Sequence, residues 1–155
     1  MTEASDSFEF EKLAHDMALI RIAKDAPSYQ AAETASEIIQ ELVFLAVTHT
    51  KGKQDPHITL RGIFRGITQA LFALNKDMPQ ACVRLLQEIP HLADRLELDF
   101  ATLMTWAMEG IASLSGPLGR DNCHKIRAKI DENFMGAGEI FEGLCAKNPQ
   151  AQTPK

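Results

Sequence analysis

The residues best suited to bind a ligand lie between positions 51 and 65, where basic side chains outnumber acidic ones. The candidate ligand- or anion-binding residues are Lys51, Lys53, His57, Arg61 and Arg65. Arg61 and Arg65 are one helical turn apart near the start of an expected helix, where free backbone N–H groups attract anions. The segment therefore predicts a site for a phosphate, a carboxylate ligand or an acidic partner helix. The alternative is a solvated basic loop that pairs with Glu37 or Glu41.

Acids and histidines at short spacing are the candidate metal ligands. Glu88 and His91 have the Glu-x-x-His spacing of di-iron carboxylate bundles, and Asp121 and His124 form a shorter analogue of that pair. Pro90 splits the first pair, and both pairs fall at the ends of expected helices rather than inside a bundle core. We therefore predict no metal site and no cofactor.

A haem is the other cofactor that the histidines could bind. Residues 91–99 are similar to the segment that follows the proximal histidine of globins, a resemblance which implies that His91 is an axial haem ligand. It covers this short stretch alone, and the N-terminal half lacks the Pro- and Phe-rich turn that globins place over the porphyrin. We do not assign the chain to that family, and a small-ligand, metal- or haem-binding bundle is the alternative function.

The nucleophilic side chains show no catalytic pattern. The three cysteines, Cys82, Cys123 and Cys145, are widely spaced and include no Cys-x-x-Cys pair, so neither a disulfide framework nor a thiolate metal site is predicted. Cys123 and His124 are adjacent and point about 100° apart on a helix, which prevents a nucleophile–base pair. There is no serine elbow and no glycine-rich phosphate loop. We expect no catalytic residue, and the pattern favours a protein that is not an enzyme.

Composition and charge exclude several partners. The 155 residues are 45% hydrophobic and carry a net charge of −5. Nucleic acid and anionic lipid are poor partners for such a chain, because phosphate binding needs concentrated positive charge. The longest apolar run, residues 42–47, is far shorter than the roughly 20 residues that span a bilayer. Together with the unpaired cysteines, these features indicate a soluble protein of the reducing cytoplasm.

An apolar pattern with three- and four-residue spacing runs from Phe8 to Leu144 and predicts helices along the chain. Caps and breakers divide it into helices expected at residues 7–24, 29–49, 58–75, 78–89, 91–114 and 121–147, and the fifth of these could restart at Asp99. The predicted fold is all-α, a single-domain irregular bundle of five to six helices over residues 1–147 with a disordered tail at 148–155. Ile63, Ile67 and Leu71 belong to the core stripe of the third helix. Beside them, Gly62, Gly66 and Ala73 form a strip of small residues that predicts close approach by another helix or by a ligand, and helix packing is the favoured alternative.

The first helix is apolar on two sides. One side contains Phe10, Leu13, Met17 and Ile20, and the nearly opposite side contains Phe8, Leu19 and Ile22. Such a helix is usually buried on two sides, either inside the domain or at the seam of a dimer. We therefore expect a non-enzymatic protein-binding, adaptor or regulatory module, with a protein partner or a homodimer formed through the N-terminal helix.

Overall fold

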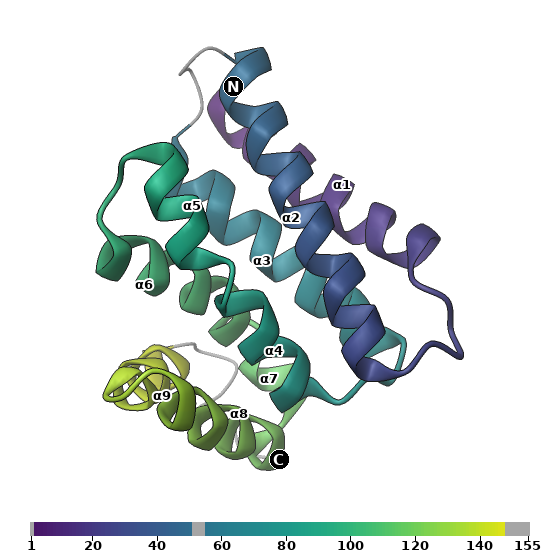
Figure 1. The fold of residues 1–155 in the computed structure, drawn as a ribbon, viewed down its shortest axis with the longest axis vertical. Coiled ribbons are helices and arrows are strands. Elements are labelled where there is room, and N and C mark those ends of the chain that lie inside the picture. The colour runs from purple at the N-terminus through teal and green to yellow at the C-terminus, as the bar shows by residue number, and fades with distance from the viewer. Residues whose placement is uncertain (1, 51–54, 148–155) are drawn as a thin grey trace.

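The computed structural model describes residues 2–50 and 55–147 (Figure 1). The helices are α1 (Thr2–Arg21), α2 (Ser28–Thr50), α3 (Pro56–Ala73), α4 (Met78–Leu86), α5 (Ile89–Leu96), α6 (Phe100–Ala112), α7 (Ser115–Leu118), α8 (Arg120–Asn133) and α9 (Ala137–Lys147). The described residues contain no strand, and the all-α prediction is confirmed. The tail predicted to be disordered, residues 148–155, lies outside the described part of the chain.

Helix α3 is surrounded by other helices. It packs against α1, α2, α4 and α6, and Figure 1 shows it crossing the middle of the bundle behind α2. The predicted core stripe is confirmed, since Ile63, Ile67 and Leu71 are fully buried. The side chains Thr59 and Thr68 are also buried, so α3 is enclosed on more than its apolar stripe.

Two glycines allow the backbones of α1 and α6 to touch α3. A Cβ atom added to Gly66 of α3 would collide with a backbone carbonyl oxygen of α1, and one added to Gly110 of α6 would collide with a carbonyl oxygen of α3. The small side chains Ala14 and Ala18 of α1 are fully buried. The close approach predicted at Gly66 is thus confirmed, whereas Ala73 is exposed and lies outside the contact.

The predicted count of five to six helices is wrong, because two expected helices are each interrupted and the short helix α7 forms between the last two of them. The one expected at residues 91–114 ends early at Glu97, whose left-handed backbone (φ 56°) terminates α5. A new helix, α6, then begins after Asp99, whose carboxylate accepts a hydrogen bond from Thr102 N at 3.0 Å. Glu97 therefore ends one helix and Asp99 caps the start of the next, although the apolar spacing continues across both residues.

The helix expected at residues 121–147 consists of α8 and α9. The chain turns at Gly136, which adopts a left-handed backbone with φ 88° that glycine tolerates best. The carboxylate of Asp131 accepts hydrogen bonds from Gly136 N and Gly138 N, both at 3.1 Å, and so satisfies backbone groups at the start of α9. The two helices then pack against each other, at the bottom of Figure 1.

Replacing Gly66 with alanine tests the contact between α1 and α3. The nearest neighbours of the added methyl group are backbone atoms of α1, which cannot rotate away as a side chain would. We expect Gly66→Ala to lower the free energy of unfolding by about 1–3 kcal/mol, the usual cost of overpacking. Urea unfolding followed by circular dichroism measures the change.

The control is Gly143→Ala on α9, where no described atom lies within 4 Å of the added Cβ. Alanine is a better helix former than glycine by up to about 1 kcal/mol, so this variant should be as stable as the wild type or more stable. Equal stability of Gly66→Ala and wild type would contradict the close packing of α1 on α3.

Candidate functional site

Three of the five predicted anion-binding residues lie on the first half of α3. They are His57, Arg61 and Arg65, whereas Lys51 and Lys53 lie outside the described residues. Asp55 caps the helix and accepts a hydrogen bond from His57 N at 2.9 Å, and Pro56 occupies its first turn. The sequence therefore places this cluster at a well-formed helix start, as predicted.

Glu109 of α6 is the acidic partner of two of these basic residues. His57 Nε2 lies 2.6 Å from Glu109 Oε1, and Arg61 Nε lies 3.8 Å from the same oxygen. The imidazole ring of His57 also stacks on Trp106, with ring centroids 4.8 Å apart and planes inclined by 13°. These contacts join the start of α3 to α6.

Arg65 connects three helices. Its Nε donates a hydrogen bond to Glu11 Oε2 of α1 at 3.0 Å. One terminal nitrogen donates to the hydroxyl of Ser113 at 2.6 Å and to its carbonyl oxygen at 3.2 Å, at the end of α6. The protein itself thus provides anionic and polar partners for His57, Arg61 and Arg65, and anion binding at this segment stays a prediction.

The acids proposed as alternative partners of the basic loop lie beside a different cation. Arg21 of α1 donates a hydrogen bond to Glu41 at 2.9 Å, and its guanidinium lies 4.0 Å from Glu37. The hydrogen bond to Glu41 raises the pKa of Arg21. Within the described part of the chain, these acids therefore bind α1 to α2.

The four metal candidates are not brought together. Glu88 is buried, and its two carboxylate oxygens accept hydrogen bonds from Gln40 and from Arg84, the latter at 2.7 Å. His91 is exposed, and Asp121 forms an ion pair with Lys125 at 3.3 Å. The described residues contain no group of three or more His, Cys, Asp or Glu side chains that could hold a metal ion.

Arg84 is a structural residue that the sequence analysis missed. Besides Glu88, it binds Glu33 of α2 through two hydrogen bonds, of 2.6 Å from Nε and 3.0 Å from a terminal nitrogen. The bonds to Arg84 lower the pKa of Glu33, and the same bonds raise the pKa of Arg84. The i, i+4 spacing of Arg84 and Glu88 could have predicted the ion pair between them. The contact of Arg84 with α2 could not be predicted in this way, because it depends on the tertiary fold.

Removing Arg84 should leave the buried carboxylate of Glu88 without its cation. We expect Arg84→Met to lower the free energy of unfolding by about 3–5 kcal/mol, measured by chemical denaturation, because an unpaired buried charge is strongly destabilising. The double variant Arg84→Met/Glu88→Met should recover a large part of that loss.

Arg21→Met is the matched control, because it removes an ion pair at the surface and should cost no more than about 1 kcal/mol. Equal losses in the Arg84 and Arg21 variants, or no recovery in the double variant, would contradict the structural role of the buried pair.

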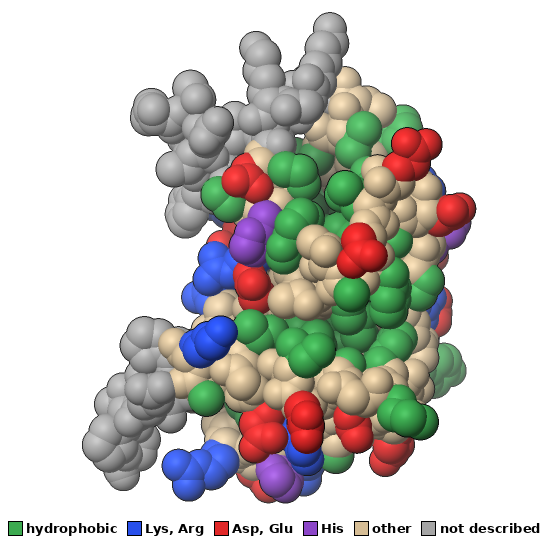
Figure 2. Space-filling model, turned by 90° about the vertical axis from the view of Figure 1, so that its left-hand side faces the viewer, with side chains coloured by type: hydrophobic (Ala, Val, Ile, Leu, Met, Phe, Trp, Pro, Cys, Tyr) green, Lys and Arg blue, Asp and Glu red, His purple; other side chains and the backbone are tan. Residues whose placement is uncertain are grey.

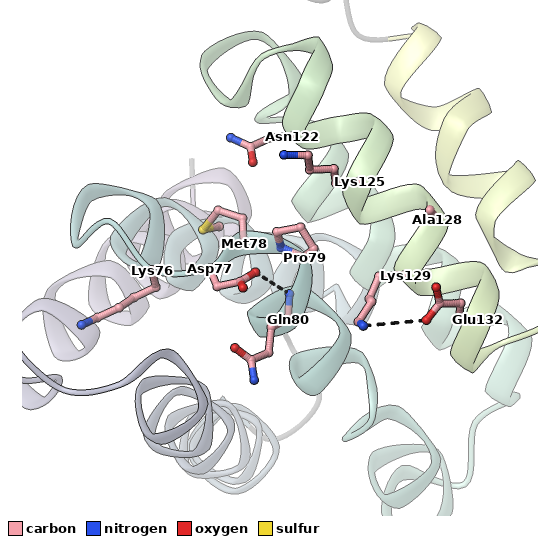
Figure 3. A pocket seen from close by; sticks show the side chains of 10 residues that line it. All are labelled: Lys76, Asp77, Met78, Pro79, Gln80, Asn122, Lys125, Ala128, Lys129 and Glu132. Carbon is pink, nitrogen blue, oxygen red and sulfur yellow. Dashed lines mark hydrogen bonds and ion pairs between the residues drawn. The ribbon is translucent and has the colours of Figure 1, made fainter.

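A hollow of about 710 Å³ opens to solvent between the start of α4 and α8 (Figure 3). Each of its lysines is bound to a partner within the protein. Lys76 donates to the carbonyl oxygens of residues 24 and 26, Lys125 pairs with Asp121, and Lys129 lies 3.7 Å from Glu132. The full lining is Lys76, Asp77, Met78, Pro79, Gln80, Asn122, Lys125, Ala128, Lys129 and Glu132. Because the hollow is open and its charges are paired, we assign no ligand to it.

The three cysteines are widely spaced in the sequence, but two of them lie on helices that pack against each other, α8 and α9. A hydrogen bond between the thiols of Cys123 on α8 and Cys145 on α9 lowers the pKa of Cys123 and raises that of Cys145. Cys82 is fully buried, and burial raises its pKa. The glycines of the expected last helix, Gly136 among them, indicated a bend or a tight crossing. They did not indicate that the chain turns back there, so that α8 and α9 lie against each other.

The core-facing side of α1 differs from both predicted sides. Its buried residues are Phe10, Ala14 and Ala18, and Ile22, which directly follows the helix, is buried as well. Leu13 and Ile20, which the prediction grouped with Phe10, are 38% and 81% exposed, and Met17 is half-buried. The alanines face the core because α1 approaches α3 too closely for larger side chains, and the side chain of Phe8 lies outside the described part of the structure.

A second apolar area lies on the face that carries α5 and α6. Figure 2 looks onto this face and shows hydrophobic side chains gathered across its middle, with acidic side chains along its lower part. The large exposed apolar residues near the connection between the two helices are Leu98 and Phe100.

Comparison with known proteins adds no functional information. No protein family model, no curated protein and no solved structure matches the chain. Among the described residues, no helix is long and apolar enough to cross a membrane. A functional argument for this protein must therefore rest on its own surface and contacts.

Proposed function

We propose that this protein is a non-enzymatic binding module that pairs through α1 with a second copy of itself. The observation that carries the proposal is the exposure of Ile20, whose side chain is 81% accessible although it lies on a well-packed helix. A large aliphatic side chain left in water on a rigid helix contributes nothing to the stability of the single chain. Covering it in an interface is favourable by about 25 cal/mol per Å² of apolar surface.

Ile20 belongs to a stripe of apolar residues on α1, which consists of Leu13, Met17 and Ile20. Leu13, Met17 and Ile20 are spaced at i, i+4 and i+7, so they lie along one side of α1. Residues of this spacing are the anchors that a helix uses when it packs against a partner helix. The buried Ala14 and Ala18 hold the other side of α1 against the bundle, so the stripe is presented by a fixed element.

Polar side chains border the stripe. Lys12 and Asp16 form an exposed ion pair at 2.7 Å, and the hydrogen bond from Lys12 is the main cause of the lowered pKa of Asp16. An apolar centre with a charged rim is the usual arrangement of a protein interface. The unpaired thiols fit a reducing compartment, and we place the module in the cytoplasm as part of this proposal.

The pairing of charges within the bundle supports a binding role over a catalytic one. Arg65, Arg84 and Glu109 each form hydrogen bonds or ion pairs that join neighbouring helices. A catalytic site needs titratable groups that converge on a pocket with unused bonding capacity. The hollow beside α4 instead has lysines that are already paired.

Ile20→Asp tests the proposed interface. The variant should fold normally because Ile20 makes little contact within the chain, yet it should be monomeric because a pair would bury an aspartate in its apolar centre. We expect the wild type to be a dimer at concentrations on the order of 10–100 µM, the range of a modest helix interface. Light scattering coupled to size exclusion measures both masses, and circular dichroism verifies the fold.

Met135→Asp is the control, because Met135 is 96% exposed in the turn between α8 and α9, away from α1. This variant should remain a dimer. A wild type that is monomeric over the whole range, or a dimer that Ile20→Asp leaves intact, would overturn the proposed pairing through α1.

A further inference from the structure

The fold of the C-terminal segment aligns two cysteines that lie far apart in the sequence. Helices α8 and α9 run in opposite directions about the turn at Gly136. Along this hairpin, Asp131 binds the backbone of Gly138, and Arg127 lies 3.1 Å from Glu142. One turn further toward the open end, the same register places Cys123 of α8 opposite Cys145 of α9.

The register set by Asp131 with Gly138 and by Arg127 with Glu142 brings the two thiols close enough to interact. Their mutual hydrogen bond makes Cys145 the donor and Cys123 the acceptor, which stabilises the thiolate of Cys123 and the protonated thiol of Cys145. In the neutral state, the thiol of Cys123 also lies 3.7 Å from the carbonyl oxygen of Ser115, to which it donates. An asymmetric pair of this kind separates the roles of attacking and resolving thiol.

The position of Cys123 on α8 adds to its reactivity. It lies in the first turn of the helix, which begins at Arg120 and follows Gly119, a residue without a side chain to cap it. The positive end of the helix dipole favours a thiolate in this turn, and the acid in the same turn, Asp121, is paired with Lys125 at 3.3 Å. Cys123 is half-buried, so a small oxidant can reach it, whereas Cys82 is fully enclosed in the core.

We propose that Cys123 and Cys145 are a peroxide-sensitive thiol pair that forms a disulfide between α8 and α9. The thiolate of Cys123 attacks one oxygen of hydrogen peroxide, the O–O bond breaks, and the departing hydroxide takes up a proton to become water. Cys123 is thereby oxidised to a sulfenic acid. The sulfur of Cys145 then attacks that of Cys123, the S–O bond breaks, and a second water leaves with the proton of Cys145. Two thiols and one peroxide give one disulfide and two waters.

The disulfide would fix the C-terminal helix. Helix α9 packs mainly on α6 and α8, so it has fewer neighbours than α3. A bond from Cys123 to Cys145 closes the hairpin at its open end and reduces the conformational freedom of the unfolded chain. Oxidation should therefore raise the melting temperature and slow the proteolytic removal of α9. This inference does not depend on the pairing proposed for α1.

The test uses the full-length protein, reduced, desalted and then treated with hydrogen peroxide. We expect the number of titratable thiols to fall from three to about one, with a mass loss of about 2 Da. Peptide mapping should find Cys123 joined to Cys145 within one chain. Cys82→Ser should form the same disulfide and lose its two remaining thiols.

Single substitutions separate the two roles. Cys145→Ser should stop at the sulfenic acid, which dimedone traps on Cys123, whereas Cys123→Ser should keep both of its thiols over the same period. Circular dichroism confirms that each variant is folded. Oxidation of Cys123→Ser at the wild-type rate, a disulfide to Cys82 or between chains, or three intact thiols in the treated wild type would overturn the proposal.

A measurement on the wild-type protein tests the same roles without any variant that could fail to fold. Iodoacetamide at neutral pH should alkylate Cys123 about tenfold faster than Cys145 or Cys82, because the thiolate is the reactive form. Mass spectrometry of the digested protein gives the three rates. Equal rates at Cys123 and Cys145, or a faster reaction at Cys145, would contradict the assigned roles.

Discussion

Where α1 and α6 press against α3, backbone touches backbone with no side chain between them. Gly66 and Gly110 make this possible, since a methyl group at either position would collide with a carbonyl oxygen of the facing helix. The short distance between the helices brings Arg65 within reach of both Glu11 and Ser113. It also explains why the side of α1 that faces the core contains alanines, as larger side chains would force the helices apart.

The exposed stripe on α1 follows from the same constraint. With the core side of this helix occupied by Ala14 and Ala18, its larger aliphatic residues lie elsewhere on the circumference, and Ile20 is left in water. Buried charge elsewhere in the bundle needs partners too. The buried carboxylate of Glu88 accepts hydrogen bonds from the cation of Arg84 and the amide of Gln40. Much of the charge in the described part of the chain thus joins helices to each other.

The sequence predicted the helices well wherever an apolar stripe was strong and a breaker was plain. The core positions of α3 are one example. Another is the start of α4 at Met78, the first residue of the helix expected there, where Asp77 accepts a hydrogen bond from Gln80 N at 3.1 Å. It indicated that a helix could restart at Asp99 but not that the preceding helix ends at Glu97, because the left-handed backbone of Glu97 has no signature as clear as a glycine or a proline. It also misassigned α1, since alanine contributes little to an apolar pattern even where it occupies the closest contact.

Contacts between distant segments were beyond prediction. The sequence identified His57, Arg61 and Arg65 as a basic cluster, but their partners Glu11, Glu109 and Ser113 belong to helices whose packing no local pattern specifies. The contact of Cys123 with Cys145 requires the turn at Gly136, and a single long helix would have placed the two thiols at opposite ends. In each case the missing information is the direction in which a helix crosses its neighbour.

The most direct test of the central role of α3 is amide hydrogen exchange in the native protein. If the bundle is organised around this helix, the amides of residues 62–71 should be among the slowest to exchange and should open only with the free energy of global unfolding. The amides of α9 should exchange faster through local opening. Rapid exchange in α3 while α8 and α9 stay protected would contradict the account.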